Sequence, residues 1–488
     1  MRNFGFTFAG TERRVLRNIS PDIFPGEFVV IAGPSGCGKS TLARAMSGHI
    51  PHVIEGEVEG SIRIDGIESR SLDLSDIACR VSLCQQDPEA QFCTLTVRDE
   101  VSFGPENLAL PLTEVARRVG ASLEAVDGSH LKERDIFCLS GGEQQRVAIA
   151  SMLAMEPEVL ILDEPTSSLG PDAASEVWTA VEKLRATRKT TIVVIEHRFE
   201  RLLTLADRMI VMNHGEVVLD GKADAVHEQF QQMTQPEWPA PSLCPAAKAR
   251  RSLRVRNLSF SYGKKEVLSG VSLDACSGEF IGIIGPNGSG KTTFLSCLAG
   301  LERPSAGEIE VEGFDVKETR VSDIARKIGF VFQIPDHQLF ERTVADEVSF
   351  ASRNFGIDRV PEAQELMREY DLLPYSARHP FKLSQGEKRR LNLCSVLPHD
   401  PATILLDEPF IGQDVANRAR ILSDLMRLRS AGRTIVMVSH DMEIAFKYCD
   451  RIVFFDSGQI LIDETPRRAA EAIAVLGMHA FLPRSEPA

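Results

Sequence analysis

The feature that most constrains the fold of this chain is an internal repeat of four short patterns in the same order. GPSGCGKST at 33–41 returns as GPNGSGKTT at 285–293, and LSGGE at 139–143 returns as LSQGE at 383–387. LDEP at 162–165 returns at 406–409, and a histidine after an apolar run, His197, returns as His440. The spacing of about 250 residues far exceeds the roughly 20–50 residues of solenoid repeats. The repeat therefore predicts that one whole domain occurs twice.

The two copies are separated by a proline-rich stretch. The segment 235–248 contains four prolines and no periodic apolar pattern, which is typical of a linker. We predict a first domain over residues 1–234, a linker over 235–251 and a second domain over 252–488. Within each half, apolar runs such as 28–32 and 280–284 alternate with helical stretches, which favours an α/β fold with a mostly parallel sheet.

Composition disfavours several classes of protein. The net charge of −14 disfavours nucleic acid as a partner, because phosphate contacts require a basic surface, and it favours a basic protein partner. The ten cysteines form no CxxC pair, so we expect neither a zinc site nor a disulfide framework. Apolar runs are strand-sized rather than the roughly 18 residues of a membrane span, and the start lacks the order of a signal peptide. We expect a cytoplasmic chain that needs another subunit to act at a membrane.

Both glycine-rich patterns satisfy GxxxxGK[ST] between an expected strand and an expected helix, which predicts two phosphate loops. Backbone N–H groups would surround the phosphates, and the following helix would point its positive end at them. Lys39 and Lys291 would reach the β- and γ-phosphates of ATP, while Ser40 and Thr292 would ligate Mg²⁺. The expected nucleotide-binding residues are Gly33, Pro34, Ser35, Gly36, Cys37, Gly38, Lys39, Ser40 and Thr41, and Gly285, Pro286, Asn287, Gly288, Ser289, Gly290, Lys291, Thr292 and Thr293.

An Asp-Glu pair follows the apolar runs 159–162 and 403–406. In a parallel α/β sheet, ligands gather at the carboxyl ends of strands. Asp163 and Asp407 are therefore expected to hold Mg²⁺. Glu164 and Glu408, one residue further on, are expected to orient or deprotonate the attacking water.

In this order and combination, the motifs resemble those of ATP-binding-cassette ATPases, and the resemblance covers nearly the whole chain, twice. It implies two P-loop NTPase cassette domains, each with a mostly parallel sheet and helices, an antiparallel β subdomain and a helical signature subdomain. It also implies that each half holds one ATP and completes the site of the other half, so that the two halves pair. The signature residues expected to meet ATP are Ser140, Gly141, Gly142, Ser384, Gln385 and Gly386.

The resemblance assigns further catalytic and binding residues. His197 and His440 match the histidine that senses the γ-phosphate. Gln86 and Gln333 match the glutamine that contacts Mg²⁺ or the attacking water, with Gln85 as an alternative to Gln86. Tyr262 and Phe8 hold the place of the aromatic residue that stacks on adenine; burial of these rings in the core is the alternative.

Several positions depart from the pattern of the family. Gln385 stands where glycine is commoner, and Gly170 in the segment 167–170 stands where the family usually has aspartate, which the second half keeps as Asp414. Because each composite site carries one departure, we expect two hydrolytic sites with unequal rates. Cys37 lies between loop glycines, so a bulky thiol reagent is expected to block the first site unless ATP protects it.

Within the family, the chain resembles fused ATPases of energy-coupling-factor importers. The supporting features are TVRDEVSFG at 96–104, TVADEVSF at 343–350, Asn107, Asn354 and IEHR at 195–198. This resemblance implies a transmembrane coupling subunit and a substrate-binding membrane subunit as partners, a vitamin or transition-metal ion as cargo, and a place on the cytoplasmic face of the membrane. The alternatives are the fused ATPase of a sugar importer, which often has one degenerate phosphate loop, and a soluble cassette protein of translation or DNA repair.

Overall fold

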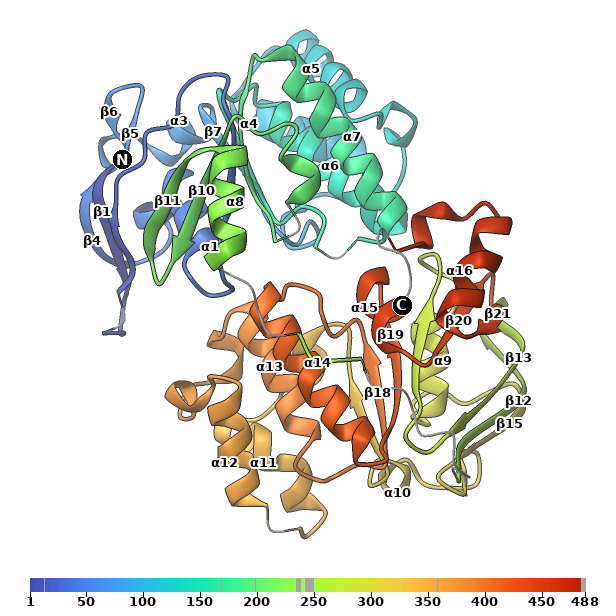
Figure 1. The fold of residues 1–488 in the computed structure, drawn as a ribbon. Helices are drawn as coiled ribbons and strands as arrows, with labels where there is room; N and C mark the ends of the chain where they lie inside the picture. Colours follow the sequence, from blue (N-terminus) through green and yellow to red (C-terminus); the bar gives the residue numbers. More distant parts are fainter. Residues whose placement is uncertain are drawn as a thin grey trace. The chain divides into compact units, whose positions relative to one another are not determined.

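The computed structural model describes residues 1–12, 14–167, 169–197, 199–233, 238–241, 250–357 and 359–483 (Figure 1). The chain divides into two compact units, one mainly of residues 1–236 and the other mainly of residues 237–488. Within the predicted linker 235–251, residues 235–237 and 242–249 lie outside the described residues. In the described part of the chain, no helix combines the length and the apolar character needed to cross a bilayer.

The first unit is built on a six-stranded sheet in which one edge pair alone is antiparallel. Buried apolar side chains cover both faces of the central strands, which explains their unbroken apolar runs. As predicted, a strand spans Phe28–Ala32. The strand order is β11 (Glu216–Lys222), β10 (Arg208–Asn213), β3 (Phe28–Ala32), β9 (Thr191–Ile195), β8 (Val159–Asp163) and β7 (Val81–Cys84), and β10 and β11 form the antiparallel pair.

The second unit repeats this sheet with the same topology. The predicted strand over 280–284 is confirmed, and the apolar run before His440 forms a second central strand. The strand order is β17 (Ile328–Val331), β18 (Thr403–Asp407), β19 (Thr434–Val438), β14 (Phe280–Ile284), β20 (Arg451–Asp456) and β21 (Gln459–Glu464), with β20 and β21 antiparallel. The α/β fold with mostly parallel sheets is therefore confirmed in both halves.

Each half also contains an antiparallel sheet, as expected for a cassette domain. In the first half, β2 (Arg14–Ile19), β1 (Arg2–Phe8) and β4 (Gly56–Ser61) form it, and a short hairpin of β5 (Arg63–Ile64) and β6 (Ile67–Glu68) follows. In the second half, the order is β13 (Lys265–Cys276), β12 (Arg251–Tyr262), β15 (Ala306–Val311) and β16 (Phe314–Asp315). In each unit the apolar face of this sheet packs into the same core cluster as the helix that follows the phosphate loop.

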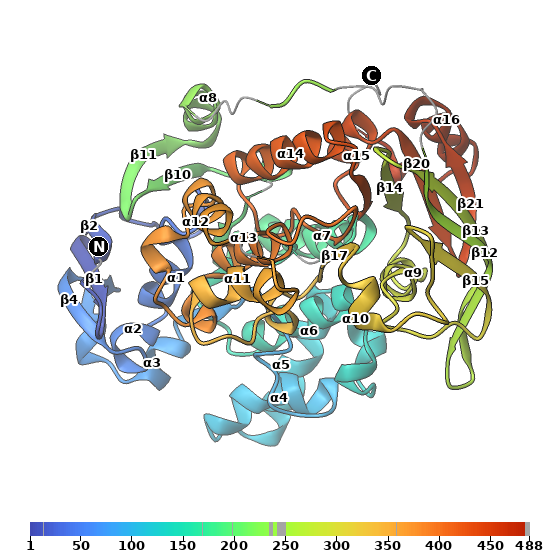
Figure 2. The same cartoon turned by 90° about the horizontal axis from the view of Figure 1, so that it is seen from below.

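A group of three helices forms a separate layer in each half, visible in both views (Figures 1 and 2). The group comprises α4 (Val97–Asn107), α5 (Leu112–Ala125) and α6 (Gly141–Leu153) in the first half, and α11 (Val344–Asn354), α12 (Val360–Glu369) and α13 (Gln385–Val396) in the second. The other helices are α1 (Lys39–Met46), α2 (His49–His52), α3 (Leu74–Ala78), α7 (Pro171–Thr187), α8 (Ala223–Met233), α9 (Lys291–Leu298), α10 (Val321–Ile324), α14 (Val415–Ser430), α15 (Met442–Tyr448) and α16 (Pro466–Val475).

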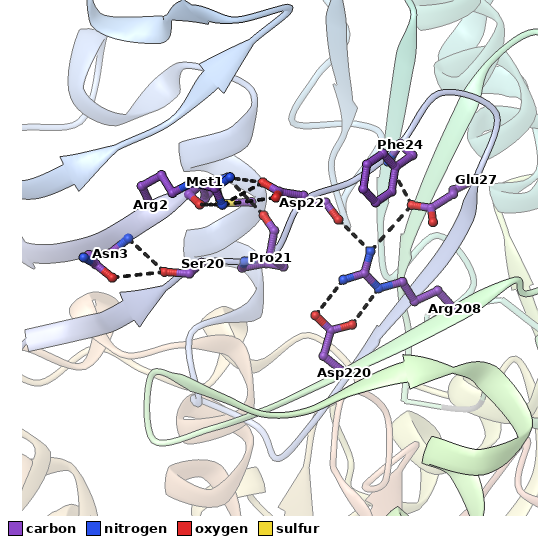
Figure 3. Close-up of polar contacts among 10 residues, drawn as sticks. All are labelled: Met1, Arg2, Asn3, Ser20, Pro21, Asp22, Phe24, Glu27, Arg208 and Asp220. Atoms are coloured by element: carbon purple, nitrogen blue, oxygen red, sulfur yellow. Dashed lines mark hydrogen bonds and ion pairs between the residues drawn. The ribbon is translucent and has the colours of Figure 1, made fainter.

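A set of contacts made by Arg208, here called the arginine clamp, holds the segment just before β3, the strand that leads into the first phosphate loop. The Arg208 guanidinium on β10 makes a bidentate pair with Asp220 on β11, at 2.6 and 2.7 Å (Figure 3). It also donates to the backbone oxygen of Asp22 at 2.6 Å and lies 3.8 Å from Glu27, just before β3. Bidentate arginine–carboxylate pairs fix geometry more tightly than single contacts, so the start of β3 is tied to the edge of the sheet.

The second half repeats this clamp at the corresponding positions. Arg451 on β20 contacts Glu279 at 2.7 Å and Asp463 on β21 at 2.6 Å. It also donates to the backbone oxygen of Asp274 at 2.5 Å. Both strands that lead into phosphate loops are therefore held at their beginning by the same device.

Candidate functional site

The two phosphate loops lie between a buried strand and the helix that follows it. Lys39 begins α1, and its ammonium donates to the backbone oxygens of Gly33 at 2.9 Å and Pro34 at 3.0 Å. In the second half, the Lys291 ammonium donates to Gly285 and Pro286 at 2.8 and 2.7 Å. Burial lowers the pKa of Lys291. Each lysine therefore lies over its own loop, close to the helix start where phosphates bind.

A hydroxyl joins each phosphate loop to the end of a neighbouring strand. The Ser40 hydroxyl on α1 donates to Asp163 at the end of β8, at 3.1 Å. The Thr292 hydroxyl makes the equivalent bond to Asp407 at the end of β18. Burial raises the pKa of each aspartate to about 6. The structure thus brings together the two residue types that were predicted to bind the metal in each half.

The chemistry of these groups fits Mg²⁺. Mg²⁺ prefers oxygen ligands and usually takes one or two carboxylates together with phosphate oxygens. Asp407 Oδ1 is buried and has no hydrogen-bond partner among the described residues, so it offers a carboxylate oxygen for such a ligand set. Ser40 and Asp163, or Thr292 and Asp407, are the residues that would hold the ion, which would neutralise charge on the phosphates.

The candidate catalytic glutamate of the first half lies between two of the predicted partners. His197 Nε2 lies 3.0 Å from Glu164 Oε1, and the Gln86 amide donates to Glu164 Oε2 at 3.0 Å. Burial alone would raise the pKa of Glu164, but the contact with His197 and the charge of Lys39 together hold this pKa below its usual value. A buried carboxylate that stays ionised can accept a proton from water. Gln86, and not Gln85, contacts this carboxylate.

The second half brings together two of these three groups. His440 Nε2 lies 3.3 Å from Glu408 Oε1, and the backbone N–H of His440 donates to Glu408 Oε2 at 3.0 Å. The side chain of Gln333 is exposed, and within the described residues no hydrogen bond joins it to Glu408. The predicted metal contacts of Gln86 and Gln333 stay predictions, since the Gln86 amide faces Glu164.

Both candidate catalytic glutamates adopt a left-handed backbone conformation. The φ angles of Glu164 and Glu408 are 50° and 54°. Such a conformation costs a residue with a side chain roughly 1–2 kcal/mol, and strained residues cluster at functional sites. The backbone N–H groups of both glutamates bond to the next strand, at Ile195 and Val438, which holds them in place.

The signature motifs form the capped beginnings of α6 and α13. Ser140 and Ser384 are the N-cap residues, and each forms a reciprocal capping box with a glutamate, Glu143 or Glu387. The capping role of these glutamates was not predicted, although their S-x-x-E spacing is the signal of a capping box. Gly142 has no room for a side chain, since a Cβ would lie 2.7 Å from that of Ala173. Of the predicted ATP contacts, the side chain of Gln385 lies outside what the structure describes.

The two predicted adenine-stacking aromatics differ in exposure. Tyr262 is 53% exposed, and its hydroxyl donates to Glu302 at 3.1 Å. Phe8 is half-buried and packs edge-on against Phe6, with ring centroids 4.9 Å apart. Tyr262 is more exposed than Phe8, although its ring also packs edge-on, against Phe260, with ring centroids 4.8 Å apart. Phe8 contributes partly to the core, the alternative considered for both rings.

In each of the two segments that resemble those of importer ATPases, 96–104 and 343–350, one carboxylate has a structural function. Glu100 on α4 is 5% exposed and accepts hydrogen bonds from the backbone N–H groups of Cys93 and Thr94. Glu347 on α11 accepts two N–H bonds from its preceding loop in the same way. These buried carboxylates therefore stabilise the loop before each helix and are not exposed for contact with a partner. Asp99, one residue earlier, is exposed.

Cys37 in the first phosphate loop is only 5% exposed, and burial raises the pKa of its thiol. Because the thiolate is the reactive form, this burial disfavours the reaction with a bulky thiol reagent that was expected from the sequence to block the first site.

We expect a maleimide to label the exposed Cys93, Cys138 and Cys276 at least about tenfold faster than Cys37. Timed quenching followed by peptide mass spectrometry measures this directly. Labelling of Cys37 at the rate of the exposed thiols would contradict its burial.

Comparison with known proteins agrees with this arrangement. The model of the ABC transporter family matches residues 16–167 and 268–411. An ABC transporter ATP-binding protein of Methanosarcina mazei, so named provisionally, is 35% identical and aligns over 94% of this chain and 88% of its own length. A Bacillus subtilis protein with the provisional name HMP/thiamine import ATP-binding protein is 33% identical, over 96% of this chain and 91% of its own.

Solved structures show the same fold at lower identity. The archaeal ribosome recycling factor, solved in complex with a ribosomal stalk protein, has a TM-score of 0.64 and 21% identity, covering 97% of this chain and 92% of its own. The RNase-L inhibitor has a TM-score of 0.63 and 22% identity, covering 97% and 93%. The family model covers both phosphate loops and both Asp-Glu pairs. This chain belongs to the ABC transporter family as an ATP-binding protein with two cassette domains, and it is an ATPase.

Proposed function

We propose that this ATPase is the energy module of an importer of the energy-coupling-factor type, and that it drives uptake of a vitamin or a transition-metal ion through separate membrane subunits. The observation that carries the proposal is that both halves keep the complete set of lysine, Asp-Glu pair and histidine. A fused sugar-importer ATPase often has a degenerate loop in one half. The whole-length similarity to the Bacillus protein named for HMP/thiamine import supports the same choice.

In this proposal each half binds one ATP and supplies the phosphate loop, the glutamate and the histidine that act on it, and the signature residues of the other half complete the site. The phosphate loop holds the β- and γ-phosphates, with Lys39 or Lys291 as the cationic contact. Glu164 or Glu408 accepts the proton of the attacking water, while His197 or His440 keeps the carboxylate in place. Mg²⁺, when bound, neutralises charge on the phosphates. We further propose that ATP closes the two halves on each other and that hydrolysis lets them open.

The partner subunits follow from charge and from the position of the helices. A chain of net charge −14 is suited to a membrane protein that presents basic cytoplasmic segments. Exposed Asp99 on α4, next to exposed Phe103, is the part of the importer-like motif that is available for such contact. The cargo would be chosen by a separate substrate-binding membrane subunit. Thiamine-type precursors come first among the candidates because of the name of the Bacillus relative; riboflavin, biotin, cobalt and nickel follow.

The proposal is tested by isolating the protein from its own cells with what binds it. We expect a tagged chain, purified from a mild-detergent extract, to carry an integral membrane protein and a second, smaller membrane subunit. An unrelated tagged ATPase from the same extract is the control. Ribosomes or nucleic acid in the preparation, with no membrane protein, would contradict the importer function and leave only the ATPase.

A further inference from the structure

The loops that carry Gln86 and Gln333 are fastened to the helical layer to very different degrees. Each loop begins where an edge strand of the core sheet ends, at β7 or β17. Each is contacted by the signature helix of the same half, α6 or α13. The residues of the helix that make these contacts differ between the halves.

In the second half, α13 holds the loop 332–338 by six hydrogen bonds, which run its whole length. The Arg389 guanidinium donates to the backbone oxygens of Phe332, at 2.8 Å, and of Gln333. The remaining bonds join Lys388 to Asp336 (2.7 Å), Asn392 to the Pro335 oxygen (3.1 Å), and the Gln338 amide to the Asn392 oxygen (2.9 Å) and the Ser395 hydroxyl (2.8 Å).

In the first half, α6 makes weaker contacts to the corresponding segment. Gln145 stands at the position of Arg389 relative to the capping serine, and among the described residues its amide contacts the Cys84 sulfur alone, at 3.4 Å. Gln144 contacts Glu89 at 3.2 Å, in place of the Lys388–Asp336 ion pair. The side chain of Gln86 is instead bonded to Glu164, which lies at the end of the core strand β8.

Arg389 is unusual because it is a buried cation. Its side chain is 4% exposed, and burial lowers its pKa to about 10 in spite of Asp407 and Glu408 nearby. A buried charge is costly unless it is well hydrogen-bonded. The two carbonyl oxygens of the loop supply those bonds, so the arginine and the loop backbone hold each other in one arrangement.

We propose that Arg389 is a positioning residue that fixes the backbone of Gln333 to α13, so that the glutamine of the second site follows the helical layer while Gln86 of the first site follows the core sheet. This inference rests on the catalytic role proposed for Gln333. When the signature helices move, Gln333 would therefore move with α13, whereas Gln86 would stay with the core sheet. This difference supplies a structural origin, within each half, for unequal hydrolytic rates.

Amide hydrogen exchange tests the contacts between Arg389 and the loop 332–338 without reference to activity. In Arg389→Gln, which installs the residue found in the first half, we expect exchange of the amides of 333, 334 and 336–338 to rise about tenfold or more. Arg390→Gln is the matched control, because Arg390 is a buried arginine on the same helix with no bond to this loop in the described structure. Unchanged exchange in Arg389→Gln, or the same rise in Arg390→Gln, would overturn the proposal.

A double-mutant cycle tests whether Arg389 affects catalysis through Gln333. We expect Arg389→Gln to lower kcat about tenfold with the KM for ATP nearly unchanged, and Arg389→Lys, which keeps the charge but has a single donor nitrogen, to recover part of the loss. In a Gln333→Ala background, Arg389→Gln should lower kcat no further. An additive loss would show that Arg389 acts elsewhere and would overturn the positioning role. Wild-type turnover in Gln333→Ala would refute the role of Gln333 itself, and a loss in Arg389→Gln would then also contradict the proposed route.

Discussion

Glu164→Gln and Glu408→Gln are each expected to lower steady-state ATP turnover by about 100-fold or more, the contribution typical of a positioned general base. Glutamine keeps the length of the side chain and one acceptor oxygen, but it cannot take a proton from water. The effect of either change should reach the whole enzyme, because the two halves are proposed to close and open together. Turnover is measured by phosphate release at saturating ATP.

Two controls separate this loss from damage to the fold. Both glutamates are buried, at 8% and 4% exposed, and glutamine has nearly the same size; the burial cost of the charge that is removed offsets the lost attraction to the neighbouring histidine. We therefore expect unchanged thermal stability and unchanged binding of a fluorescent ATP analogue in both variants. If one variant kept wild-type turnover, that site would be regulatory, and the prediction of two hydrolytic sites would be wrong.

The sequence was sufficient for the parts of the fold that depend on local pattern. Phe28–Ala32 and Phe280–Ile284 are unbroken apolar runs, because central strands of a covered parallel sheet are buried on both faces. The helix starts at Ser140 and Ser384 follow from cap chemistry that is local to four residues. The proximity of Ser40 to Asp163 could be expected because strand ends of a parallel sheet meet at one edge.

Features that depend on three-dimensional packing could not be derived in this way. Glu100 belongs to the segment 96–104, whose resemblance to importer ATPases implied a membrane partner, yet its carboxylate turns inward to accept hydrogen bonds from backbone N–H groups. The burial of Arg389 could not be foreseen either, because arginine is usually exposed. The sequence does show that Gln145 and Arg389 differ at matching positions. The structural effect of this difference depends on which carbonyl oxygens lie within reach of the side chain, and only the structure shows that.

Gly285→Ala is expected to lower both the stability of the second half and its binding of nucleotide strongly. Gly285 follows β14 with φ at 141°, and a Cβ there would lie 2.0 Å from the backbone oxygen of Phe455 on the neighbouring strand β20. A backbone oxygen in a sheet cannot move aside as a flexible side chain can. The loop must therefore shift, and because Lys291 donates to the Gly285 oxygen, the lysine would be displaced with it.

We expect Gly285→Ala to lower the free energy of unfolding of the second half by about 3 kcal/mol or more, combining backbone strain with the collision, and to abolish binding of an ATP analogue there. Gly356→Ala is the matched control. It also has a positive φ, at 70° in the αL region, but no atom lies within 4 Å of the added Cβ, so the change should cost about 1–2 kcal/mol and leave nucleotide binding as it is. Denaturant unfolding and nucleotide titration of both variants measure the difference. Equal stability of the two, with full ATP binding by Gly285→Ala, would show that the loop can relax away from β20 and that its position does not depend on that glycine.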